Sequence, residues 1–362
     1  MADGRWRDVQ PRGSVLDTSL SLQEIKRLQE IEVKPAQFHR ESCSCDPEYS
    51  SLDSGFVQPY QPDRTRSNMG PLIQMNRKLL SLFGVISLVY FTCFSSLRYL
   101  HAETVFLGRH EHSSQLHGTK VQFLARDLQS GIDYVLADSD LTTRHSPFST
   151  FKIPNMLIAL ETGVSTSPDH WRDWDPVKRP AEEFWPDVWK QGQTLDQAFA
   201  RSAVWYFRDL ALDIGTEAYR DYLTSWAYGN SEVPEGSDHF WLGDTLKIST
   251  REQVDFLEKL VSGELGVSRA NLDSLERASF QGSQASISLH GKTGTGPDQG
   301  GAWEGRFSGW YVGYLRRTEK RPVVFALHVS APSFSALRSF RKAFSLTLLQ
   351  DAGLITSVQF EP

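Results

Sequence analysis

The stretch that decides the fold is Phe148–Asn155, which reads FSTFKIPN and continues as IALETG at Ile158–Gly163. Apolar residues follow Ser149 at helical spacing, and Gly163 is a suitable C-terminal stop, so we expect a helix here. Ser149 and Lys152 form a Ser-x-x-Lys pair, which a helix places on one face, about one turn apart. A serine hydroxyl needs a base beside it, and a lysine can serve where burial lowers its pKa. The stretch therefore predicts an activated serine nucleophile.

Three further short motifs follow in order: Ser202-Ala203-Val204, Tyr228-Gly229-Asn230 and Lys292-Thr293-Gly294. The last ends an alternating segment, Ser286–Lys292, and so lies at the end of a predicted strand. Its lysine offers a cation, its threonine a hydroxyl, and its glycine lets a ligand approach the backbone closely. Each motif is weak alone, but this order within about 150 residues is very unlikely by chance.

The surrounding pattern predicts an α+β fold: an antiparallel sheet of five to six strands flanked by helices, with a mostly helical subdomain. The expected strands are Lys120–Arg126, Ile132–Leu136, Ser286–Lys292, Phe307–Leu315 and Pro322–Ser330. Further helices are expected at 194–212, 215–227 and 334–352. Residues 170–189, rich in tryptophan and proline, read as a loop or short helices. The first and last segments are expected to meet in the sheet.

Together these motifs resemble those of the serine β-lactamases and penicillin-binding proteins, and most closely the class D, oxacillinase-type β-lactamases. The nucleophile segment 148–163 is similar almost letter for letter. Phe240-Trp241-Leu242, Gly309-Trp310 and Arg341 match as well. The resemblance covers about residues 118–355 and leaves out residues 1–102. It implies hydrolysis of β-lactam antibiotics through a serine acyl-enzyme.

By this resemblance, Ser149 is the nucleophile and Lys152 the general base. The backbone N–H groups of Ser149 and Thr295 would form the oxyanion hole. Ser202 would pass a proton to the leaving lactam nitrogen. The substrate-binding residues implied are Val204, Lys292, Thr293, Gly294, Thr295 and Arg341.

Val204 stands where class A enzymes and most penicillin-binding proteins carry a polar asparagine. An apolar residue there favours a neutral Lys152 amine, which can add carbon dioxide. The resemblance therefore implies an N-carboxylated Lys152, with Trp241 donating its indole N–H to the carbamate. No metal and no cofactor other than carbon dioxide or bicarbonate is expected.

Two alternatives remain beside the hydrolase. One is a β-lactam sensor that is acylated but turns over slowly, and the other is a membrane-anchored transpeptidase acting on peptidoglycan. Val204 argues against the transpeptidase. The expected partners are small-molecule β-lactams, and an oligomer is compatible with the sequence.

Composition supports a globular chain with no sign of a nucleic-acid partner, because the net charge of the 362 residues is −6. Three cysteines are too few for a disulfide framework, and none follows Cys93. Cys43 and Cys45 lack a second ligand pair, so we interpret them as ordinary thiols.

The N-terminal part has a different character. Residues 1–74 are rich in Pro, Ser and Gln, and we expect a poorly ordered extension or the product of a start codon placed too early. Leu79–Leu97 carries no charge over 19 residues and would span about 28 Å as a helix. Arg77 and Lys78 precede it, which predicts that the chain beyond is exported. Residues 75–102 are therefore a signal peptide or one membrane anchor, and residues 103–362 form a periplasmic or otherwise extracytoplasmic catalytic domain.

Overall fold

The computed structural model describes residues 103–116, 118–298, 303 and 305–361. The expected extension, 1–74, and the whole of the signal or anchor segment, 75–102, lie outside these residues. Within the described part, no helix is both long and apolar enough to cross a membrane.

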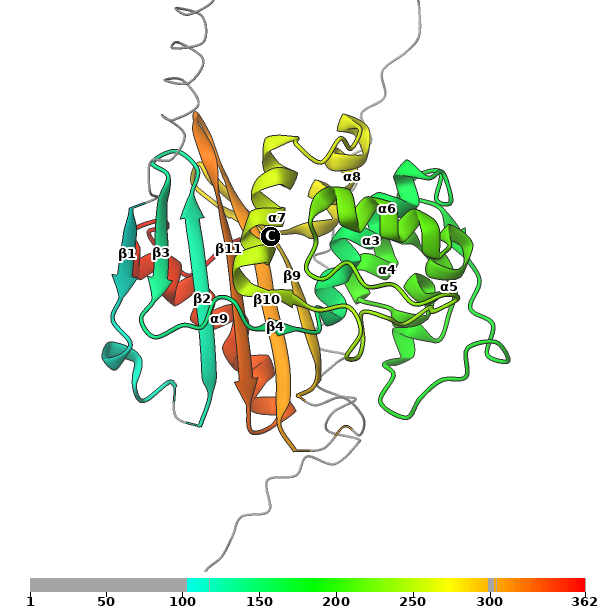
Figure 1. The fold of residues 1–362 in the computed structure, drawn as a ribbon, viewed down its shortest axis with the longest axis horizontal. Coiled ribbons are helices and arrows are strands. Elements are labelled where there is room, and N and C mark those ends of the chain that lie inside the picture. The colour runs from blue at the N-terminus through cyan, green and yellow to red at the C-terminus, as the bar shows by residue number, and fades with distance from the viewer. Residues whose placement is uncertain (1–102, 117, 299–302, 304, 362) are drawn as a thin grey trace, which may run out of the picture. The chain divides into compact units, whose positions relative to one another are not determined.

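A seven-stranded sheet runs through the described part in the order β1-β3-β2-β11-β10-β9-β8 (Figure 1). Its strands are β1 (Thr104–Leu107), β2 (Lys120–Asp127), β3 (Ile132–Leu136), β8 (Phe280–Gln284), β9 (Ile287–Pro297), β10 (Phe307–Arg317) and β11 (Lys320–Ala331). Only the β1–β3 pair among them is parallel. The expected α+β class is confirmed, and β2 pairs with β11 as the closure of first and last segments requires. The sheet has seven strands because β1 and β8 join the five expected ones.

Helices cover both faces of the sheet, as Figure 1 shows for α7 (Thr250–Ser262) in front and α9 (Phe334–Asp351) behind. The side chains of successive strand residues point to opposite faces of the sheet. Leu124 and Val324 pack in the core beneath α7, whereas Phe123 and Phe325 pack in the core that contains the apolar residues of α9. This period of two is the pattern of a sheet buried on both faces.

The remaining helices form the helical subdomain and a few short turns. They are η1 (His110–His112), η2 (Phe148–Phe151), α3 (Lys152–Glu161), η3 (Asp187–Trp189), α4 (Leu195–Arg201), α5 (Val204–Ile214), α6 (Thr216–Trp226) and α8 (Arg269–Ser279). Two small ladders join β4 (Arg144–His145) to β7 (Ile248–Ser249) and β5 (Trp171–Arg172) to β6 (Gln193–Thr194). Residues 170–189 are mostly loop with the short turn η3, as expected, whereas the two-residue strand β5 was not expected.

The expectation of one helix over 194–212 is wrong. The chain breaks between α4 and α5, because Ser202 adopts a left-handed backbone with φ +59° and caps α4. Ala203 is extended and begins α5. The break falls within the Ser-x-Val motif and turns Ser202 away from the helical path.

Candidate active site

The nucleophile candidate lies on a tight turn rather than within an α-helix. Ser149 is the second residue of the 3₁₀ turn η2, and Lys152 is the first residue of α3. The two side chains nevertheless meet, since Lys152 Nζ lies 2.9 Å from Ser149 Oγ in a hydrogen bond. The Ser-x-x-Lys spacing therefore brings the expected base to the expected nucleophile.

Lys152 is completely buried, and its ammonium lies over the ring of Phe207 at 5.2 Å from the centroid. Burial, aided by the positive charge of Lys292, holds the pKa of Lys152 well below its usual value. Among the described residues, no carboxylate lies within ion-pair distance of it. A neutral amine is therefore the favoured form of this side chain.

A second serine–lysine pair faces the same site. Lys292 on β9 donates from Nζ to Ser202 Oγ at 3.1 Å. The left-handed backbone of Ser202 is what exposes its hydroxyl at the end of α4. Two motifs separated by 90 residues thus supply one hydrogen-bonded pair.

The Lys-Thr-Gly strand runs close to the nucleophile turn. A Cβ at Gly294 would lie 2.8 Å from the carbonyl oxygen of Pro147 and 3.2 Å from the amide nitrogen of Ser149. Only glycine allows β9 and η2 to approach so closely. Thr295, the next residue of β9, lines the same cavity as Ser149.

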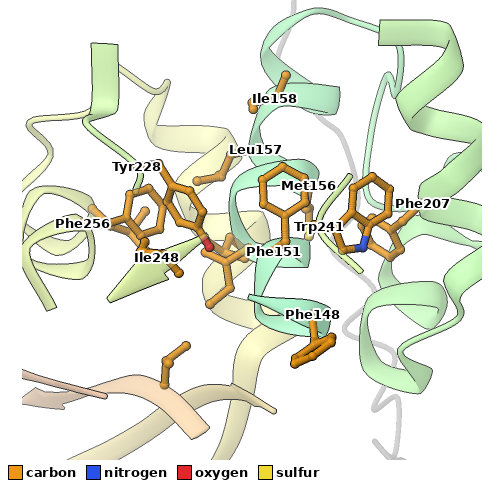
Figure 2. Packing of buried hydrophobic residues seen from close by; sticks show 14 of the residues in the cluster. Phe148, Phe151, Met156, Leu157, Ile158, Phe207, Tyr228, Trp241, Ile248 and Phe256 are labelled. Carbon is orange, nitrogen blue, oxygen red and sulfur yellow. The ribbon is translucent and has the colours of Figure 1, made fainter. Parts of the chain in front are cut away.

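Trp241 packs against Phe151 of the nucleophile turn, and Figure 2 shows it beside Phe207. It is fully buried and stacks on Phe151 with ring centroids 5.2 Å apart. Its carbonyl oxygen accepts hydrogen bonds from the Ser146 hydroxyl at 2.8 Å and from the Phe148 amide at 3.0 Å. Its indole Nε1 is buried with no hydrogen-bond partner in the described part of the chain. A buried donor of this kind is uncommon and calls for an acceptor.

These residues line a cavity of about 620 Å³. Of the predicted site residues, those on its wall are Ser149, Ser202, Val204, Lys292, Thr293, Gly294, Thr295 and Arg341. Lys152 and Trp241 lie behind that wall. Arg341 of α9 is only 1 % exposed, and Arg338, one turn earlier, lines the cavity as well. The structure thus brings all the predicted site residues into one region.

Sequence reasoning missed the aromatic part of the wall. Phe184 and Trp303 come from distant loops, yet their ring centroids lie 4.7 Å apart and both line the cavity. Trp189 lines it too and donates from Nε1 to the carbonyl of Arg201 at 2.8 Å. The many tryptophans in 170–189 were the available signal for this aromatic wall. Their pattern fits a loop, and it does not indicate which residues they contact.

Tyr228-Gly229-Asn230 supports the site from outside the cavity. A Cβ at Gly229 would lie 2.0 Å from the Lys247 carbonyl oxygen. Asn230 donates to the Thr245 carbonyl at 2.7 Å and accepts from the Lys247 amide at 2.9 Å. The motif therefore holds the end of the loop that carries Trp241 through these hydrogen bonds and the close approach at Gly229.

No group of three or more His, Cys, Asp or Glu side chains is arranged to hold a metal ion within the described ranges. Cys43 and Cys45 lie outside those ranges.

Comparison with known proteins places the chain in a family. Residues 117–345 match the family model of the penicillin-binding protein transpeptidase domain. The probable β-lactamase YbxI of Bacillus subtilis is 35 % identical over 235 residues, covering 65 % of this chain and 82 % of the relative.

Two solved structures are similar over most of the described part. The class D β-lactamase from Sebaldella termitidis has a TM-score of 0.62 and 29 % identity, covering 70 % of this chain and 98 % of that one. The C-terminal domain of the Bacillus licheniformis BlaR penicillin receptor has a TM-score of 0.62 and 26 % identity, with 70 % and 98 % covered. The chain belongs to the penicillin-binding protein transpeptidase domain family and, within it, to the class D β-lactamases.

Proposed function

We propose that this chain hydrolyses β-lactam antibiotics through an acyl-enzyme on Ser149, with carboxylated Lys152 as the general base. The observation that carries the proposal is the 2.9 Å contact between Ser149 Oγ and a fully buried lysine without a carboxylate partner in the described part. A lysine so placed has a lowered pKa and is suited to take the hydroxyl proton.

The residues around Lys152 fit a carbamate on its Nζ. A neutral amine adds carbon dioxide and releases one proton to solvent, and the product is an anion that needs a buried donor. The unpartnered Nε1 of Trp241, whose ring stacks on the residue before Lys152, is such a donor. When present, the carbamate supplies an oxygen base both for the serine proton and for the water that releases the product.

Acylation uses the rest of the site. Ser149 Oγ forms the new bond to the lactam carbonyl carbon as it loses its proton. The amides of Ser149 and Thr295 would then stabilise the oxyanion, because Gly294 lets η2 and β9 approach closely. Ser202 would relay the proton that Ser149 gives up, so that the lactam nitrogen gains it as the ring C–N bond breaks and the base is restored. Lys292, 3.1 Å from the Ser202 hydroxyl, would stabilise the charge that develops there.

Substrate recognition follows from the cationic side of the cavity. Lys292, Thr293 and Arg341 would hold the carboxylate that β-lactams carry, through charge-assisted hydrogen bonds. Val204, partly buried against the core, would keep the base pocket apolar.

Intact-mass measurement during incubation with benzylpenicillin tests the assignment. The wild-type chain should show a transient adduct of one penicillin, and Lys152→Ala should lose both rapid acylation and release. Ser149→Ala should show no adduct. Ser339→Ala, a serine on the same cavity whose hydroxyl donates to the Ser335 carbonyl, is the control and should still be acylated. An adduct on Ser149→Ala would contradict the nucleophile assignment.

Similarity to the BlaR receptor domain favours one second function, a β-lactam sensor that is acylated and released slowly. The two functions share acylation and differ in deacylation. A wild-type adduct that persists for hours in bicarbonate buffer would favour the sensor, whereas an adduct that clears would favour the hydrolase.

A further inference from the structure

The residue before the proposed nucleophile joins a bulky side chain to an unusual backbone. Phe148 has φ +48°, in the left-handed region that large L residues rarely adopt. Such a conformation persists only where the surroundings hold it. Here the Phe148 amide donates to the Trp241 carbonyl at 3.0 Å, and the side chain is only 4 % exposed.

The Phe148 ring occupies the space in front of Gly296. A Cβ at Gly296 would lie 2.1 Å from Cε1 of that ring and 2.6 Å from Cδ1. No larger residue fits there while the ring keeps its place. The ring therefore packs against Gly296 of the strand that carries Lys292. Figure 2 shows it beside the nucleophile turn.

A second cavity, of about 100 Å³, also has Phe148 in its wall. Phe148, Leu242 and Pro297 line both this cavity and the 620 Å³ cavity that contains Ser149. The rest of its wall is largely polar and includes His145, Asp244, Lys247, Asp298 and Ser308. The Phe148 ring is thus part of the partition between the reaction cavity and a polar space beside it.

We propose that Phe148 is a specificity-determining residue, whose ring limits the bulk that a β-lactam carries next to its scissile carbonyl. The inference rests on the proposed acylation of Ser149. The scissile carbonyl must come within bonding distance of Ser149 Oγ, so groups on the neighbouring ring carbon lie close to the adjoining wall. The favoured substrates are β-lactams with compact, flexible acyl side chains, and rigid, branched aryl side chains are disfavoured.

The test compares acylation rates of the full chain by two penicillins that differ in side-chain bulk: benzylpenicillin and a 2,6-dimethoxyphenyl penicillin. Phe148→Ala joins the two cavities and should raise the ratio of bulky to compact acylation rates by about tenfold, a size typical of pocket selectivity. Phe148→Leu keeps most of the volume and should raise the ratio less. A Phe148→Ala ratio within twofold of wild type would overturn the proposal.

A second measurement tests the partition without substrate. Gly296→Ala should lower the thermal midpoint in the wild-type background, because the new methyl group displaces the Phe148 ring. It should lower the midpoint less in the Phe148→Ala background, and an equal loss in both would contradict the packing argument.

The two proposals fail in distinguishable ways. Absence of any adduct with either penicillin on the wild-type chain would overturn the proposed function, and the role of Phe148 with it. Normal adducts with an unchanged ratio in Phe148→Ala would overturn the role of Phe148 alone.

Discussion

At the scale of single residues, Lys152 is where sequence pattern and electrostatics agree most closely. Its spacing to Ser149 predicts contact, and the structure adds complete burial beside a second cation, Lys292. Both features disfavour the ammonium form. If Lys152 is the proposed carboxylated base, this environment would make its activity depend on pH and on dissolved carbon dioxide.

We predict that activity is lost after incubation at about pH 5 and returns on neutralisation with bicarbonate. Acid protonates the Lys152 amine and removes a carbamate, and a neutral amine can add carbon dioxide again once its lowered pKa is exceeded. The measurement is the rate of β-lactam hydrolysis after neutralisation with bicarbonate or with chloride. Equal recovery in the two buffers would argue against a carbamate.

Two stacked histidines next to the site predict acid sensitivity of the fold. His145 and His328 have ring centroids 3.7 Å apart. Burial lowers the pKa of both, and the neighbouring His145 lowers that of His328 further. Unfolded histidine binds a proton below about pH 6.5 and these folded ones resist it, so the free energy of unfolding falls as pH drops below that value.

Each of the two histidines would contribute up to about 1.4 kcal/mol per pH unit to the slope of the free energy of unfolding against pH. Urea unfolding of wild type and His328→Gln between pH 7.5 and 5.5 measures it, and the variant should show the smaller slope. His110→Gln, at an exposed histidine, is the control and should keep the wild-type slope. Identical slopes for all three proteins would contradict the prediction.

The sequence predicts the site residues better than it predicts their surroundings. Short motifs predict Ser149, Lys152, Ser202 and Lys292 because the proposed chemistry needs those residue types at those spacings. The structure brings the four together as two hydrogen-bonded pairs. The unpartnered indole of Trp241 and the left-handed backbone of Phe148 arise from tertiary packing, which no local pattern encodes. The Phe184–Trp303 contact joins two loops and is equally beyond local patterns.

At the scale of elements, an ion-pair network ties the tryptophan-rich loop to the helical subdomain. Arg179 from that loop contacts Asp209 of α5 at 2.8 Å and Asp238 at 2.6 Å, and all three side chains are largely buried. Asp238 also pairs with Arg208 and precedes Trp241 by three residues. The network therefore links the loop that carries Trp189 to the loop that carries Trp241.

We predict that Arg179→Ala lowers the free energy of unfolding by about 2 kcal/mol. The variant loses the charge-assisted hydrogen bonds that Arg179 makes, although Asp209 keeps Lys178 and Asp238 keeps Arg208. Arg269→Ala is the matched control, since its pair with Asp273 is exposed on α8 and should cost less than about 0.5 kcal/mol. Urea unfolding at neutral pH measures both. Equal, small losses would show that the network contributes little.

Among the elements, periodicity predicted the five central strands but ended one of them too early. The strand expected at 286–292 continues as β9 to Pro297, so Lys292-Thr293-Gly294 lies within the strand and not at its end. The apolar spacing over 194–212 continues across Ser202, so it gives no sign of the break that the Ser202–Lys292 contact accompanies. Strand β8 was missed because its sequence, FQGSQ, has no apolar alternation. Helix α7 was not predicted, although the sequence carries a usable signal for its start, the capping box from Ser249 to Glu252.

At the scale of the whole molecule, the family match and the described fold both fall within the C-terminal part of the chain. We propose that this part acts outside the cytoplasm, delivered by the apolar segment Leu79–Leu97. Two forms are compatible with the proposal, a cleaved signal and a retained anchor.

We predict a mature N-terminus near Glu103. The basic residues Arg77 and Lys78 before the apolar segment resemble the start of a signal peptide. Mass spectrometry of the protein purified from its native cells measures the N-terminus. A chain that still begins at Met1 would contradict cleavage and favour the anchor.

The central claim is that the chain hydrolyses β-lactams rather than only binding them. The most direct test counts product per enzyme with a chromogenic cephalosporin in bicarbonate buffer. We expect many turnovers in the wild-type protein and none in Lys152→Ala. A single stoichiometric burst that then stops would contradict the account and indicate a receptor that is acylated without hydrolysis.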